Sequence, residues 1–89
     1  MKAIVTVIGK DTVGIIAGVC ARLAERGVNV LDISQTIMHG YFTMIMLVDL
    51  TACASSFDGL SAELADYGEE RGLSIRIQRE DIFNAMHRI

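Results

Sequence analysis

The sequence predicts an α+β sandwich with the chain order βαββαβ: a four-stranded antiparallel sheet, two helices on one face and a short C-terminal helix. Residues 2–8 and 41–50 are apolar at both alternating parities, which is typical of central strands, and residues 2–8 are expected to be buried on both faces. Residues 28–38 and 73–78 are half polar, as edge strands are. This pattern predicts the strand order 4-1-3-2, the ferredoxin-like arrangement, with right-handed crossovers.

The first helix is predicted between about Val13 and Arg26, after a turn over residues 9–12 in which Asp11 or Thr12 can cap it. Gly27 fits the left-handed position just past the helix end. The helix has one apolar stripe at three- and four-residue spacing, formed by Ile15, Ile16, Val19, Cys20 and Leu23.

The middle of the sequence predicts a β-hairpin. In residues 28–38 the apolar residues alternate with polar ones, and this alternation changes parity at Leu31, which predicts a bulge or a twist. His39-Gly40 is the best hairpin turn in the chain. It joins this half-polar strand to the apolar strand over residues 41–50.

The second helix is predicted to begin at Ser55 or Ser56 and to end at Gly72. Its buried stripe contains Phe57, Leu60, Leu64 and Tyr67. The last strand, residues 73–78, is half solvated. A tail at 81–89 forms an amphipathic pattern with Ile82, Phe83, Met86 and Ile89. The whole chain, 1–89, is one domain with a core over 2–80.

One face of the predicted sheet has no helix over it. The central strands nevertheless offer apolar residues to both sides, Val5, Val7, Met44 and Met46 among them. We therefore expect an open face that is apolar near its centre and covered by a second subunit, the C-terminal tail or another protein.

Composition narrows the classes of partner. Hydrophobic residues make up 52% of the chain, and the net charge is −3 with eight Lys and Arg. The sparse basic residues argue against nucleic acid and an anionic membrane surface. The N-terminal apolar run is too short for a signal or a membrane span. Two cysteines, Cys20 and Cys53, are then expected to be reduced thiols in a cytoplasmic protein.

Several runs of the sequence resemble a known family. Residues 11–17 resemble the opening of an ACT domain, and residues 27–33 resemble the entry of its second strand. Residues 33–38, 42–49 and 80–89 resemble a bacterial family of free-standing single ACT domains. The chain is also similar to the ACT parts of glycine-cleavage regulators and of formyltetrahydrofolate deformylase. Many ACT domains have Pro where this chain has Val13, a residue compatible with a first helical turn.

The resemblance implies a homodimer, paired side by side or back to back, that binds a small effector such as an amino acid at its interface. The contacts it implies are Asp11, Thr12, Val13, Gly14 and Ile15 in the first loop and Asn29, Val30 and Asp32 on the second strand. Helix N-terminal amides attract a carboxylate, and an aspartate could hold an ammonium.

Purely structural roles remain open for four of these residues. Asp11 can be an ordinary helix cap, and Gly14 can relieve crowding against a strand. Asn29 can be a turn residue, and Asp32 can be an edge charge that discourages aggregation.

No catalytic or metal-binding constellation is visible in the sequence, and no cofactor is expected. Cys20 lies on the apolar helix stripe, while Cys53 lies in a connection, where it can be exposed, with no activating His or Asp near it. His39 fits a solvated turn and His87 the tail, without metal-ligand spacing. The sequence therefore does not predict an enzyme, and the resemblance to ACT domains implies a regulatory, effector-binding module. The alternative is a ligand-free interaction module that docks a metabolic enzyme or regulator.

Overall fold

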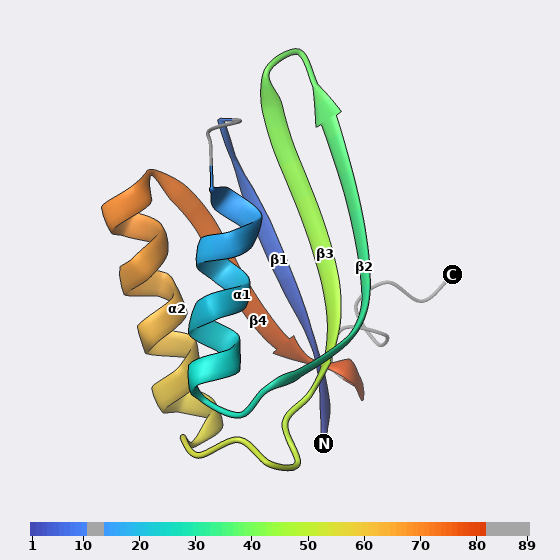
Figure 1. Ribbon diagram of the computed structural model, residues 1–89, viewed down its shortest axis with the longest axis vertical. Coiled ribbons are helices and arrows are strands. Elements are labelled where there is room, and N and C mark those ends of the chain that lie inside the picture. Colours follow the sequence, from blue (N-terminus) through green and yellow to red (C-terminus); the bar gives the residue numbers. More distant parts are fainter. Residues whose placement is uncertain (11–13, 82–89) are drawn as a thin grey trace.

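The computed structural model describes residues 1–10 and 14–81 (Figure 1). Both helices lie on one face of a four-stranded sheet ordered β2-β3-β1-β4, in which all paired strands are antiparallel. The predicted ferredoxin-like fold and strand order are confirmed. The predicted C-terminal helix lies, from residue 82 on, outside the described residues. The elements are β1 (Lys2–Lys10), α1 (Ile15–Glu25), β2 (Asn29–Met38), β3 (Tyr41–Asp49), α2 (Phe57–Arg71) and β4 (Leu73–Arg79).

The core lies between the sheet and the helices. Alternate residues of β1 and β3 face the helices and pair across the strands, as Val5 does with Met46 and Val7 with Met44. All four are fully buried. Helix α1 contributes Ile15, Val19 and Leu23 to this core, and α2 contributes Leu60, Leu64 and Tyr67.

Two residues of the predicted α1 stripe lie at the margin of the core. Cys20 is half-buried against it, and Ile16 is 37% exposed. The buried stripe is narrower than predicted because α1 presents one side to the sheet while Ile16 turns toward the β2 side. Cys53 is likewise half-buried against the core.

The face of the sheet opposite the helices, here called the open face, is apolar along its centre. The expectation that β1 is buried on both faces is wrong for the single chain: Ile8 on β1 is 47% exposed, and Ile45 on β3 is 42% exposed. Both α1 and α2 lie on the other side, so no helix of residues 1–10 and 14–81 covers these side chains.

The predicted apolar centre of the open face is confirmed, but Ile4, Ile8, Ile45 and Leu47 form it. The residues expected to reach both faces, Val5, Val7, Met44 and Met46, all face the helices, because they share one parity of the paired strands.

The predicted bulge in β2 is confirmed at Leu31. Val30 pairs with Val48 and Asp32 pairs with Leu47, so Leu31 is the extra residue. Beyond the bulge, Gln35 pairs with Met44, so Gln35 shares the helix-facing side of the sheet. The predicted hairpin turn follows, where His39 and Gly40 both have positive φ, 51° and 81°.

Helix ends follow the predicted glycine and serine positions, with one shift. The Ser56 hydroxyl accepts a hydrogen bond from Gly59 N at 3.0 Å and caps α2, which ends at Gly72 with φ 71°. Gly27 follows α1 with φ 75°. The N-cap of α1 is Gly14, so the helix begins two residues later than predicted. The predicted capping residues, Asp11 and Thr12, lie outside the described residues.

A bidentate ion pair joins the two helices. Arg26 Nε donates to Glu63 Oε2 at 2.7 Å, and Arg26 Nη2 donates to Oε1 at 2.9 Å. These hydrogen bonds lower the pKa of Glu63 below its usual 4.5 and raise the pKa of Arg26. The pair links the last turn of α1 to the middle of α2.

Because the pKa of Glu63 is lower in the folded chain, its ionised form stabilises the fold above pH 4.5. That contribution is lost as the pH falls through the folded pKa. We expect Glu63→Gln to flatten the pH dependence of the unfolding free energy below pH 4.5, measured by urea titration. Asp49, whose pKa is lowered by hydrogen bonds from Thr51, leaves a residual slope. Identical slopes for the variant and the wild type would contradict the expectation.

Candidate functional site

A cavity of about 340 Å³ lies at the N-terminal end of α1. The first turn of the helix forms one side, and the hairpin of β2 and β3 forms the other. Figure 1 shows the hairpin extending past the start of α1. Ile37 and Phe42, which are paired across the hairpin, form part of the wall. The described lining residues are Gly14, Ile15, Ile16, Ala17, Gln35, Ile37 and Phe42.

The first turn of α1, Gly14 to Ala17, lines this cavity. Gly14, at the N-cap, has φ 85° and no side-chain cap hydrogen bond, and the turn contains no acidic residue. Among the described residues, a side chain at Gly14 would meet nothing within 4 Å, so the glycine serves its left-handed conformation. Free helix N-terminal amides favour an anionic group such as a carboxylate.

The rest of the lining is mostly apolar. Isoleucine, alanine and phenylalanine side chains form the wall, and Gln35 adds an amide that can both donate and accept hydrogen bonds. Such a combination suits a small molecule with a carboxylate at one end and a less polar remainder.

The residues that the family resemblance implied for a ligand site do not all lie together in the structure. Gly14 and Ile15 line the cavity, while Asp11, Thr12 and Val13 lie outside the described residues. Asn29, Val30 and Asp32 lie at the opposite end of β2, paired with residues 49, 48 and 47 at the end of β3. Seven residues of β2, about 23 Å, separate Val30 from Ile37. A single chain therefore does not bring the two groups together.

The sheet register also separates the side chains of the second group. Val30 packs partly buried against the core. Asn29 pairs with Asp49 and Asp32 with Leu47, both on the open face of the sheet. The carboxylate of Asp32 is exposed and accepts a hydrogen bond from the following amide, Ile33 N, at 2.9 Å.

Sequence reasoning missed Ile16, Ala17, Gln35, Ile37 and Phe42 as lining residues. The signal for Gln35 was present, because it is a polar residue between two isoleucines after the bulge. The change of parity at the bulge turns this glutamine toward the helices, which reading the strand as half polar does not reveal.

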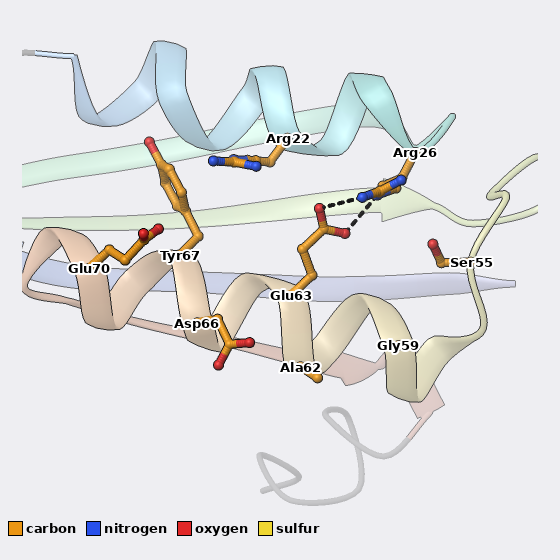
Figure 2. Close-up of a pocket in the computed structure, with 9 residues that line it drawn as sticks. All are labelled: Arg22, Arg26, Ser55, Gly59, Ala62, Glu63, Asp66, Tyr67 and Glu70. Atoms are coloured by element: carbon orange, nitrogen blue, oxygen red, sulfur yellow. Dashed lines mark hydrogen bonds and ion pairs between the residues drawn. The ribbon is translucent and has the colours of Figure 1, made fainter.

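A second hollow, of about 540 Å³, lies between α1 and α2. Figure 2 shows Arg22, Arg26, Glu63 and Tyr67 in the space between the helices. The guanidinium of Arg22 lies 4.8 Å from the centre of the Tyr67 ring, and that of Arg71 lies 5.5 Å from it. Glu63 already binds Arg26. The charged groups here bind one another or the Tyr67 ring, and these contacts hold the two helices together.

The part of the chain that the structure describes holds no group of three or more His, Cys, Asp or Glu side chains placed to bind a metal ion. Within that same part, none of the helices has the length and hydropathy needed to cross a membrane. His39 is exposed in its turn, as predicted.

Fold and site together define a small α+β module with a ligand-sized cavity between a helix N-terminus and a strand hairpin. The family model of the ACT domain matches residues 2–78, and the chain belongs to the ACT domain family. More particularly, it belongs with the UPF0237 proteins. It is 62% identical over 89 residues to a UPF0237 protein of Clostridium acetobutylicum, with 100% of both chains covered. The predicted family resemblance is confirmed.

Solved structures of other proteins share this fold. An ACT domain protein from Streptococcus pneumoniae is 45% identical, with a TM-score of 0.83 over 98% of each chain. A formyltetrahydrofolate deformylase from Pseudomonas syringae is 23% identical, with a TM-score of 0.80 over 88% of this chain and 27% of its own. A putative glycine cleavage system transcriptional repressor is 20% identical, with a TM-score of 0.74 over 86% of this chain and 44% of its own. The last two show the shared fold alone.

Proposed function

We propose that the chain is a regulatory module that binds an amino acid or a related small carboxylate at a homodimer interface. The observation that carries the proposal is the cavity between the N-terminal end of α1 and the hairpin. The anion-attracting amides and the apolar wall match the two halves of such a ligand. Membership of the ACT family supports a regulatory role rather than a catalytic one.

The β2 edge supports the dimer. All ten residues of β2 but Val30 are exposed, and its single charged residue is Asp32. Ile37 is 58% exposed. Soluble proteins usually protect a long edge strand with charges, as β4 does here with Arg76 and Arg79. An exposed edge strand with a single charged residue fits pairing with a second copy.

Antiparallel pairing of two β2 strands would also reunite the implied site residues. The start of one strand would then lie beside the end of the other. Val30 of one chain would approach Gln35 and Ile37 of the other on the helix side, near Gly14 and Ile15, while the side chains of Asn29 and Asp32 would lie along the same edge on the open face. The site we propose thus combines the loop of one copy, Asp11 to Ile15, with Val30 at the strand start of its partner.

The ligand is tested by isothermal titration against the amino acids and their 2-oxo acids. Ala17 is exposed, lines the cavity and stands in the first turn of α1. Ala17→Glu adds a negative charge that suits a helix start but repels a bound carboxylate. We expect affinity to fall at least tenfold, while Ala17→Gln, equal in size and uncharged, falls less. Silence of the wild type across the panel would refute ligand binding.

The dimer is tested by sedimentation equilibrium at micromolar concentration. The wild type should have a mass near twice the 9.7 kDa of one chain. Ile37→Lys places a charge on the apolar β2 edge and should shift the protein to monomer. Ser74→Lys places the same charge on exposed β4 and should leave the dimer intact. A wild-type monomer, or equal effects of the two variants, would contradict pairing through β2.

The alternative function is docking of an enzyme or regulator without a ligand. The same measurements distinguish it from the proposed function. A dimer that binds none of the amino acids or 2-oxo acids would favour it.

A further inference from the structure

The cavity between the start of α1 and the hairpin has a buried floor and exposed sides. Ile15 and Phe42 are buried core residues and form the floor. Ile16 on α1 and Ile37 on β2 line opposite sides of the cavity, and both side chains are exposed. A ligand in the cavity would therefore remove apolar surface of both isoleucines from water. The volume, about 340 Å³, lies at the lower end of the range for small-molecule sites and suits a molecule the size of an amino acid.

These apolar sides favour one class of ligand side chain. Each methylene group that the ligand buries against them raises the affinity about fourfold. A charged or amide side chain gains little from the same contact and loses its hydration. The described lining residues contain no charged side chain that could compensate for that loss. The lining therefore suits a ligand whose side chain is aliphatic or aromatic.

Gln35 is the one polar side chain among the described lining residues. It lies on the helix-facing side of β2, two residues from Ile37, because the bulge changes the parity of the strand. Its amide can accept a hydrogen bond from an ammonium group or donate one to an oxo group. Against the apolar part of a ligand, the same amide would lose water without gaining a hydrogen bond. The polar end of a ligand therefore belongs beside Gln35, and the side chain belongs between the isoleucines.

We propose that the cavity selects amino acids or 2-oxo acids whose side chain is aliphatic or aromatic, and that Gln35 contacts the amino or oxo group of the ligand. This selectivity rests on the proposed function, because it names the class of ligand for the same site. Ile16 and Ile37 then determine specificity through the apolar surface that the ligand covers, and Gln35 determines the orientation of the ligand between them.

Pairs of ligands with similar size and shape test the selectivity. Isothermal titration of the full chain compares leucine with asparagine and valine with threonine. We expect leucine to bind about tenfold more tightly than asparagine, or more, and valine to bind more tightly than threonine. Asparagine or aspartate binding as tightly as leucine would overturn the selectivity and leave the proposed function standing. Silence of all the amino acids and 2-oxo acids would instead remove the proposed function, and the selectivity with it.

Two exposed isoleucines on opposite faces of the sheet test the apolar contact. Ile16→Ala should weaken leucine binding about fourfold or more, and should weaken asparagine binding less. Ile8→Ala removes the same groups from the open face, away from the cavity, and should leave both affinities unchanged. Because both side chains are exposed, neither variant should unfold the chain. Equal leucine affinities of the two variants would overturn the contact with Ile16.

The role of Gln35 is tested by adding a charge to either side of β2. Gln35→Glu should favour an ammonium group over an oxo group, and should raise the affinity ratio of leucine to its 2-oxo acid about tenfold. Ser34→Glu adds the same charge to the open face, where Ser34 pairs with Ile45, and should change the ratio by less than about twofold. An unchanged ratio in Gln35→Glu, or equal ratios in the two variants, would overturn the contact of Gln35 with the ligand.

Discussion

Replacing Leu23 with alanine should cost about 2–5 kcal/mol of unfolding free energy. Leu23 is fully buried in the last turn of α1. Its removal loses the transfer energy of the side chain and leaves a cavity between helix and sheet. A domain of this size has a total stability of roughly 4–13 kcal/mol, so the variant should be partly unfolded at moderate temperature.

Urea denaturation followed by circular dichroism measures this loss. Ile16→Ala is the matched control, because it removes an aliphatic side chain from the same helix at a position 37% exposed. We expect it to cost about 1 kcal/mol or less. Equal losses for the two variants would show that the core does not lie where the fold places it.

Replacing Gly27 with alanine should destabilise the chain by about 2–5 kcal/mol, for two additive reasons. Gly27 has φ 75°, a conformation that a side chain disfavours. A Cβ there would also lie 2.6 Å from the carbonyl oxygen of Ala52. That backbone cannot easily retreat, because Ala54 N donates to Arg26 O at 2.9 Å and ties the two segments together.

Gly72 separates the two reasons experimentally. Its φ of 71° is nearly the same, but a Cβ there would meet nothing within 4 Å. Gly72→Ala should therefore cost only the conformational part, about 1–2 kcal/mol. Thermal or urea unfolding of both variants measures the difference. If Gly72→Ala lowers the unfolding free energy as much as Gly27→Ala does, the contact with Ala52 does not contribute to the destabilisation.

Much of the fold could be predicted from the sequence, because it depends on interactions between residues that are close together in the chain. Gly27 and Gly72 end their helices, and Ser56 caps α2, because these positions depend on backbone conformation and on neighbours within three residues. The bulge at Leu31 was visible because the alternation of apolar residues changes there. Apolar runs at both parities placed β1 and β3 in the centre.

The residues of the candidate site could be predicted from the sequence only in part. Gly14 and Ile15 were found through family resemblance, and they do line the cavity. The opposing wall of Gln35, Ile37 and Phe42 depends on how the hairpin lies over the start of α1. That placement follows from packing between segments about twenty residues apart, which periodicity along the chain does not encode.

By itself, the sequence determined the order of elements, the central and edge strands, the turns and the apolar character of the open face. Each of these depends on residues near one another in the chain or on a repeat of two or 3.6 residues. The tertiary structure alone decided that Ile16 and Ile8 are exposed, and that Asn29 and Asp32 lie at the far end of β2 from Gly14. Such facts depend on which surfaces meet, because burial is a property of contacts between layers and not of any one segment.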